Sequence, residues 1–270
     1  MPEPADLSYA LKLDPEDAIR YFRAKGYAIS WDWQDLWQQA HNKAFTVAKA
    51  LEEDVLRDIR EMVDEALAEG ITFRDFQKQL EPKLRAKGWW GRKFIVDLAG
   101  NVEKAQLGSP WRLRTIYDTN LQVAYAAGHR TEQLENTDSR PWWQYVGILD
   151  SRIRPAHRAL HGLVFRFDDP FWQRFYPPNG WNCRCTVRAL TRDQVQERIA
   201  DGRSRLMVTN EQSGFRDLDA NVARATLGQE EVLISEKTGE LGTRATLSFT
   251  DRDGRKLTVR TDAGWSYAPE

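Results

Sequence analysis

Hydrophobic residues in the N-terminal third recur at three- and four-residue steps, the period of one face of an α-helix. This spacing predicts a long helix over residues 33–69, broken at most once and ended by Gly70, and a second helix from the cap Thr72 to Lys87. A shorter helix is expected over residues 14–29, ending at Gly26. The N-terminal part is therefore predicted to be a helical bundle. The apolar stripe of the long helix comprises Phe45, Ala48, Leu51, Val55, Ile59, Met62 and Ala66.

The middle of the chain alternates between helical and extended patterns. Ser109 and Pro110 have the cap and first-position chemistry of a helix that we expect to reach about Leu134. Short β-branched and aromatic runs predict strands, and Pro155 and Gly162 delimit a helix of about two turns. This arrangement predicts a compact α+β unit. Its expected strands cover residues 142–149, 163–167 and 183–190, and a last helix runs from the cap Thr191 to about Ala200.

The C-terminal region is more polar. Residues 202–230 are weakly patterned and are expected to form a linker, whereas Asp253-Gly254 between two alternating runs, 244–250 and 256–261, predicts a β-hairpin. The predicted fold class is thus α+β. We expect three regions: a helical part over 1–108, an α+β domain over 109–201, and a linker with a hairpin tail over 202–270.

Composition is that of a globular chain. Hydrophobic residues make up 41% and charged residues 29% of the 270 positions, which suffices for a core. No apolar run approaches the length of a membrane span, so we expect no membrane partner. The two cysteines form no disulfide framework, which points to a reducing compartment such as the cytoplasm.

The net charge of −1 conceals an uneven distribution. Between Lys49 and Glu69 eight acidic residues face three basic ones, whereas between Arg140 and Arg192 nine arginines face three aspartates. Arginine forks match phosphate geometry, so the basic block is compatible with contact to DNA. Docking on an acidic partner surface and a solvated face with local Asp–Arg pairing explain it equally well.

The candidate chemistry lies between Asp150 and Cys185. His157 and His161 are four residues apart and are expected on one helix face, while Cys183 and Cys185 are expected on one face of a strand. Together these four side chains could close a tetrahedral zinc site. The alternative is that the cysteines pack as small hydrophobic residues and that His161 interacts with the helix C-terminus.

An enzymatic role has weaker support. A metalloprotease helix needs a glutamate directly after its first histidine as general base, and this position holds Arg158. The chain has no nucleophilic-serine motif, phosphate-binding glycine loop or dinucleotide fingerprint. A metal-dependent nuclease or peptidase, with Asp150 as base, stays open as an alternative, as does a DNA-binding module. Asp168 and Asp169 precede Pro170 and fit a turn.

The same stretch resembles the signature of the phage Mu protein F-like family, the phage head morphogenesis or minor head proteins. The matching elements are Asp150-x-Arg152-x-Arg154-Pro155-x-His157, His161-Gly162, Pro177-Pro178-Asn179-Gly180-Trp181 and Cys183-Arg184-Cys185. Residues 114–120 also resemble the helix that precedes this signature.

The resemblance implies a minor virion component at or near the portal vertex, made in the host cytoplasm. Its expected partners are the portal protein and other head proteins, and its expected role is in procapsid assembly and DNA packaging or delivery. In this interpretation Arg152, Arg154, Arg158 and Arg184 contact the portal or DNA. A second possibility is that Arg152 and Arg154 pair with Asp150 and shape the turn before the histidine helix.

Overall fold

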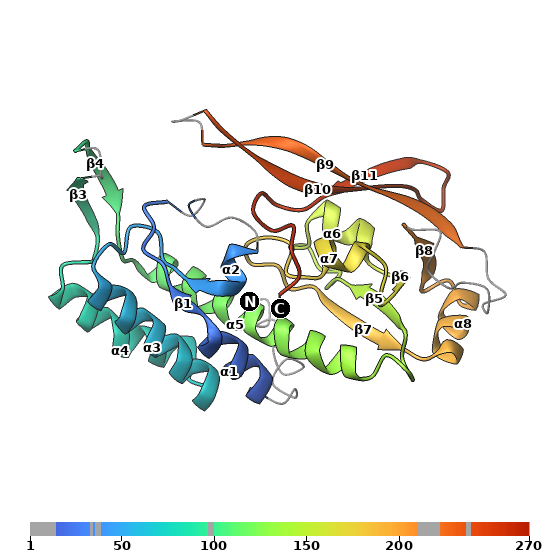
Figure 1. The fold of residues 1–270 in the computed structure, drawn as a ribbon, viewed down its shortest axis with the longest axis horizontal. Coiled ribbons are helices and arrows are strands. Elements are labelled where there is room, and N and C mark those ends of the chain that lie inside the picture. Colours follow the sequence, from blue (N-terminus) through green and yellow to red (C-terminus); the bar gives the residue numbers. More distant parts are fainter. Residues whose placement is uncertain are drawn as a thin grey trace. The chain divides into compact units, whose positions relative to one another are not determined.

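The computed structural model describes residues 15–32, 35, 39–96, 100–209, 222–235 and 239–269 (Figure 1). The chain forms two compact units that divide between His129 and Arg130, within one long helix. Helices dominate the first unit and a mixed sheet the second, so the predicted α+β class with a mainly helical N-terminal part is confirmed. The expected boundaries at 108/109 and 201/202 stay predictions.

The first unit is a small set of helices around one hydrophobic core. Its helices are α1 (Pro15–Ala24), α2 (Ala40–Lys43), α3 (Glu53–Glu69), α4 (Phe73–Ala86) and the first part of α5 (Pro110–Glu135). Apolar side chains of α3 and α4, including Leu56, Ile59, Phe76 and Leu80, are fully buried in this core. The caps follow the expected chemistry, because the Thr72 side chain accepts a hydrogen bond from Asp75 N and that of Ser109 accepts one from Arg112 N.

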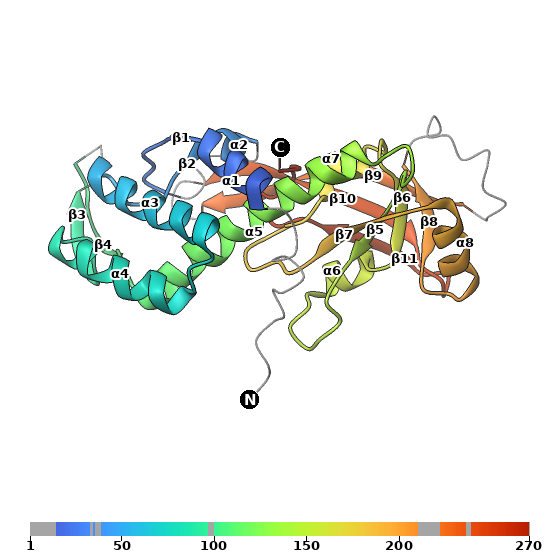
Figure 2. The same ribbon diagram turned by 90° about the horizontal axis from the view of Figure 1, so that it is seen from below.

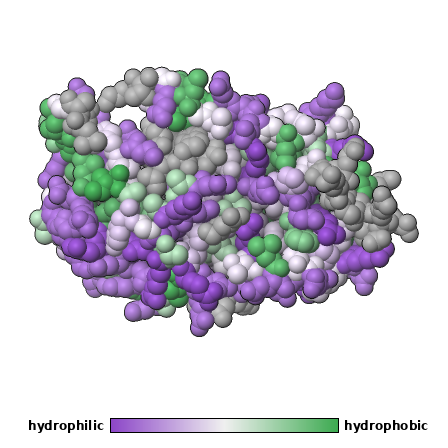
Figure 3. Space-filling model, viewed as in Figure 1, coloured by the Kyte–Doolittle hydropathy of each residue, from purple (hydrophilic) through white to green (hydrophobic). Residues whose placement is uncertain are grey.

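Two short sheets accompany these helices. The strands β1 (Gly26–Tyr27) and β2 (Ala44–Phe45) pair in parallel, and β3 (Arg92–Val96) pairs with β4 (Val102–Gln106) in an antiparallel ribbon that the sequence pattern did not predict. Hydrophobic side chains gather where this ribbon lies, at the upper left of Figure 3. They include Phe94, whose exposed fraction is 73%.

The helix expected over residues 33–69, with at most one break, is interrupted in its middle. Among the described residues, α2 ends at Lys43, β2 follows, and α3 begins only at Glu53. Lys49 lies between them with a φ of 61°, a left-handed conformation that a continuous helix does not accommodate. Phe45 nevertheless reaches the core, since the apolar stripe is satisfied by a strand followed by a helix.

The second unit contains a seven-stranded mixed sheet in the order β11-β10-β9-β8-β6-β5-β7. The strand β5 pairs antiparallel with both β6 and β7, whereas β8 lies parallel to β6 and β9 (Figure 2). The expected hairpin is confirmed as β10 and β11, with Thr250 opposite Lys256. The strands are β5 (Trp142–Val146), β6 (Leu163–Arg166), β7 (Thr186–Leu190), β8 (Arg205–Val208), β9 (Ala223–Ser235), β10 (Glu240–Thr250) and β11 (Lys256–Arg260).

Three helices complete the second unit: α6 (Pro155–Leu160), α7 (Phe171–Phe175) and α8 (Arg192–Ala200). The expected cap of α8 is a full capping box between Thr191 and Gln194. The helix α7, which the sequence pattern did not predict, places Phe171 and Trp172 against Trp143 of β5 and Phe165 of β6, with ring centroids 4.0 to 6.1 Å apart. This aromatic cluster is part of the buried core of the second unit.

Part of the predicted linker forms strands, because β8 and the beginning of β9 fall within residues 202–230.

In the described part of the chain, no helix is both long and apolar enough to cross a membrane.

Candidate metal and anchor sites in the second unit

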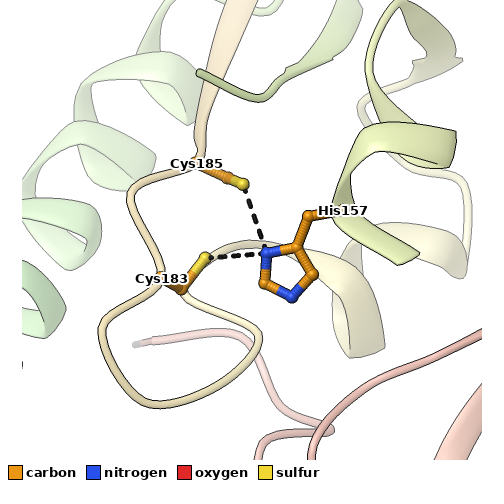
Figure 4. A group of neighbouring side chains, drawn as sticks. All are labelled: His157, Cys183 and Cys185. Carbon is orange, nitrogen blue, oxygen red and sulfur yellow. Dashed lines mark hydrogen bonds between the residues drawn. The ribbon is translucent and has the colours of Figure 1, made fainter. Parts of the chain in front are cut away.

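A group of three side chains, His157, Cys183 and Cys185, converges in the second unit (Figure 4). The helix α6 places His157 in the interior, where only 4% of the residue is exposed, and Cys183 is also buried. The imidazole Nδ1 faces both sulfur atoms, at 3.5 Å from Cys183 Sγ and 3.4 Å from Cys185 Sγ. The cluster thus combines two residues of one loop with one residue of a helix that lies about 26 positions earlier in the chain.

The predicted strand over residues 183–190 begins later than expected. The strand β7 starts at Thr186, so both cysteines lie in the loop that precedes it. This loop turns tightly, because Asn182 adopts a left-handed φ of 55° and Cys183 N donates to Gly180 O at 3.2 Å. The turn, rather than strand alternation, directs both thiols toward His157.

His161 lies outside this group. The helix α6 ends at Leu160, and His161 takes an extended ψ of 129°, so the four-residue spacing no longer places both imidazoles on one face. Its Nδ1 instead accepts a hydrogen bond from Gly147 N at 3.1 Å. Among the described residues the metal-compatible cluster therefore has three members, where the sequence suggested four.

The geometry of the three side chains fits a zinc ion. Zinc–sulfur and zinc–nitrogen bonds of about 2.3 and 2.0–2.1 Å at a tetrahedral angle give nitrogen–sulfur edges of about 3.6 Å. The two observed edges are 3.5 and 3.4 Å, and all three ligand atoms lie within 4.8 Å of one another. Such a tetrahedron has a fourth vertex that a water molecule or another ligand would occupy.

The electrostatics of the cluster favour one thiolate. Burial opposes ionisation of Cys183, but hydrogen bonds from Cys185 and His157 outweigh it and lower the pKa of Cys183 well below its ordinary value. The hydrogen bond to Cys183, together with burial, raises the pKa of Cys185. Thiolates are the form that binds metals, so this direction of the Cys183 pKa favours a charged ligand.

A second network joins the other signature residues around Arg154. Its guanidinium donates to Asp262 Oδ2 at 2.9 Å and to the carbonyl oxygen of Trp181. Gly180 leaves room for this contact, because a Cβ there would overlap both the Asp262 carboxylate and the Arg154 guanidinium as they are placed. The backbone of Asn179 accepts from Asp262 N at 3.1 Å. Arg154 thus anchors the chain after β11 to the Pro-Pro-Asn-Gly-Trp loop, and Trp181 and Trp265 meet edge to face at 5.2 Å.

Asp150 organises the remaining signature arginines. Its carboxylate accepts from Arg184 Nη2 at 2.7 Å and from Arg152 Nε at 3.4 Å, and its carbonyl oxygen accepts from Arg158 Nη2 at 2.9 Å. The hydrogen bond from Arg184 is the largest cause that holds the pKa of Asp150 below its usual range. A carboxylate held in its charged form this way is a weak general base. The expected pairing with Asp150 is observed for Arg152, whereas Arg154 pairs with Asp262.

Two residues of these networks, Asp262 and Tyr145, had no motif signal in the sequence, and the role of a third, Asn179, was not predicted. Tyr145 is fully buried, donates to Asn179 Oδ1 at 2.8 Å, and has a raised pKa, mainly because of burial. Asn179 lies within the Pro-Pro-Asn-Gly-Trp motif, but its partner on β5 could not be deduced. Asp262 lies 108 positions from Arg154, and no local pattern connects them.

Comparison with known proteins agrees with this description. Residues 57–188 match the family model described as Phage Mu protein F like protein. The chain is 44% identical over 267 residues to the "Putative capsid assembly protein F" of Escherichia phage Mu, which covers 98% of this chain and 56% of the relative. It is 42% identical over 239 residues to the Mu-like prophage FluMu F protein of Haemophilus influenzae, covering 88% of this chain and 52% of the relative.

The chain belongs to the phage Mu protein F-like family. It spans about half the length of the curated relatives that it matches. No solved structure shows a significant match to it.

Proposed function

We propose that this chain is a minor head protein of a tailed phage or prophage. In this proposal it associates with the portal protein during procapsid assembly, acts in DNA packaging or delivery, and becomes part of the virion. The observation that carries the proposal is the 44% identity over 267 residues to a protein named for capsid assembly. The residues of the family signature lie at the anchor and the cluster described above.

Assembly of procapsids with and without the portal protein tests this proposal. The chain would be expressed with the major head, scaffold and portal proteins of the same phage, and procapsids would be separated by sedimentation. We expect the chain to sediment with portal-containing procapsids and to stay unbound when the portal is omitted. Equal incorporation without the portal would contradict the portal association. Failure to enter either particle would contradict the assembly role.

We also propose that His157, Cys183 and Cys185 bind one zinc ion that stabilises the second unit. The support is the pair of nitrogen–sulfur distances, 3.5 and 3.4 Å, which correspond to two edges of a zinc tetrahedron. The sulfur–sulfur edge of such a tetrahedron is about 3.8 Å. With all three ligand atoms within 4.8 Å of one another, the sulfurs need to approach by at most about 1 Å.

Elemental analysis of the purified chain tests the zinc proposal. We expect about one zinc per chain, lost in both Cys183→Ser and His157→Gln, because each removes one of three ligands. His161→Gln is the matched control, since His161 bonds to Gly147 N instead of facing the sulfurs. Zinc that is lost equally in His161→Gln would make His161 a ligand. Absence of zinc from the wild-type chain would contradict the proposal.

A metal-dependent hydrolase is the second candidate function, favoured only by the open fourth vertex of the three-ligand cluster. It also needs a base near that vertex. Asp150 is engaged by Arg184 and Arg152, and Tyr145 has a raised pKa. Nuclease and peptidase assays of the zinc-loaded chain, with Cys183→Ser as control, test this candidate.

We also propose that four arginines of the family signature contact the portal or DNA: Arg152, Arg154, Arg158 and Arg184. Each of these side chains already bonds within the second unit, so an acidic partner would compete with Asp150, Asp262 or a backbone carbonyl. Arg158 is the one whose loss perturbs the fold least, because it bonds only to the Asp150 carbonyl oxygen among the described residues. Loss of portal or DNA association in Arg158→Gln, with unchanged thermal unfolding, would support a contact role.

A further inference from the structure

The second unit contains a cavity of about 580 Å³ that none of the roles above uses. Its lining combines β6, β7, α6, α8, β8 and the turn between β10 and β11. Five arginines contribute to the lining, against a single carboxylate, that of Asp251. The five are Arg188, Arg198, Arg203, Arg205 and Arg252.

Most of this positive charge is not neutralised within the described part of the chain. Arg203 forms ion pairs with Glu197 and Asp201. Asp251 is occupied in its own turn, where its Oδ1 accepts from Asp253 N at 2.9 Å and Arg255 N at 2.8 Å. Among the described residues, no ion pair joins a carboxylate to any of the other four cavity arginines.

The remaining four arginines differ in how firmly they are held. Arg205 donates to the carbonyl oxygen of Thr250, and Arg252 donates to those of Gly202 and Ser204, which fixes both side chains without neutralising them. The guanidinium groups of Arg188 and Arg198 form no hydrogen bond or ion pair with any described residue. Both side chains are half-buried, so their guanidinium groups are available to a ligand within the part of the chain that the structure describes.

The charges around the cavity favour an anion. Burial, followed by the positive charges of Arg188 and Arg203, lowers the pKa of Arg198, although the charges of Glu197 and Asp201 act in the opposite direction. Burial also lowers the pKa of His161, another lining residue, and the charge of Arg188 adds to the effect. A bound anion would relieve this repulsion among neighbouring cations.

We propose that this cavity binds a phosphate group of a nucleotide or of a nucleic-acid strand, with Arg188 and Arg198 as its principal ligands. The guanidinium fork matches phosphate oxygens, and a phosphate offers three strong acceptors, enough for several forks at one place. The volume lies in the range of small-ligand pockets, and Phe249 and Leu257 add apolar lining that suits a sugar or base. A phosphate site of this kind deepens the proposed role in DNA packaging. Only its biological context rests on that proposed role.

Binding to the purified full chain tests the proposal. The probes are a labelled 12-nucleotide single strand, followed by fluorescence anisotropy, and deoxyadenosine monophosphate and inorganic pyrophosphate, followed by calorimetry. The test variant is Arg188→Gln with Arg198→Gln. The matched control is Arg174→Gln with Arg192→Gln, which makes the same charge change in the same unit at residues that do not line the cavity.

We expect the test variant to weaken phosphate binding by roughly tenfold or more per arginine, and the control to change it less than about threefold. For the single strand, the slope of log affinity against log salt should fall by about 0.7 per arginine removed. Binding of the strand supports a nucleic-acid ligand, and binding of the mononucleotide alone supports a free nucleotide. Equal losses in both variants, or no binding of any phosphate probe, would overturn the proposal.

Chemical modification of the wild-type chain, with pyrophosphate or a polyglutamate peptide as protecting ligand, makes the test independent of variant folding and of portal binding. In the wild-type chain, pyrophosphate should protect Arg188 and Arg198, but not Arg174 and Arg192, from modification by phenylglyoxal. Unprotected cavity arginines, or equally effective protection by a polyglutamate peptide, would overturn a phosphate site. These binding assays contain neither procapsid nor portal protein. Loss of the phosphate site would therefore appear in these assays, whereas loss of portal association would appear only in the procapsid experiment.

Discussion

Replacing Gly180 by alanine should loosen the connection between the Pro-Pro-Asn-Gly-Trp loop and the chain that follows β11. A methyl group at this position would overlap the Arg154 guanidinium and would lie 2.6 Å from Asp262 Cγ. Both obstacles are the ends of flexible side chains, so we expect them to move aside while the backbone stays in place. The Arg154–Asp262 ion pair and the hydrogen bond from Arg154 to the Trp181 carbonyl would then be lost.

The size of the effect follows from these two interactions. The side chains of Arg154 and Asp262 are 37% and 39% exposed, so solvent screening limits their ion pair to about 0.2–1 kcal/mol. A hydrogen bond from a charged donor contributes about 1.5–3 kcal/mol when buried, and less at this partial exposure. We therefore expect Gly180→Ala to lower the free energy of unfolding by about 1–3 kcal/mol.

Urea unfolding, with hydrogen exchange followed by mass spectrometry, measures this effect. Peptides covering residues 177–185 and 262–267 should exchange faster in the variant, and the loss should be non-additive with Asp262→Asn because both changes break the same contact. Gly26→Ala is the control, since the nearest atom to its added Cβ is Lys43 O at 3.7 Å. Full additivity with Asp262→Asn, or a loss below about 0.5 kcal/mol, would refute this explanation of Gly180.

Three other predictions concern the core, pH and the Asp150 network. Trp143→Ala should cost about 3–5 kcal/mol in thermal unfolding, because the fully buried ring contacts Trp172 and Tyr176; a cost below about 1 kcal/mol would contradict this packing. Burial lowers the pKa of Lys25 to about 7. The unfolded chain then binds more protons between about pH 7 and 10, so the free energy of unfolding should rise from pH 7 to 9.5, and Lys25→Met should flatten this slope. Asp150→Asn should weaken the dependence of stability on pH below about 4, because the stabilisation from this low-pKa carboxylate is lost as pH falls through that range; an unchanged acid transition would show that the pairing with Arg184 contributes nothing.

Local chemistry determined much of this fold in advance. Thr72, Ser109 and Thr191 act as helix caps where their spacing indicated, and the turn around Asp253-Gly254 joins β10 to β11. Such features depend on residues within four positions of one another, so the sequence pattern contains their full physical cause.

The same locality explains the errors. The apolar stripe over residues 33–69 is compatible with both one helix and a strand followed by a helix, and the left-handed Lys49 decides between them. The pairing of His157 with His161 assumed a helix that lasts one residue longer than α6 does. Once the helix ends, the four-residue rule no longer applies.

The sequence by itself determined the α+β class and the family signature, and it suggested four side chains for a metal site, of which three converge. Only the tertiary structure decided that His161 lies outside this cluster, that Arg154 reaches Asp262 across 108 positions, and that five arginines line one cavity. The physical reason is that periodicity and capping act over a few residues. Ion pairs, cavities and ligand clusters instead depend on which distant segments the sheet brings side by side.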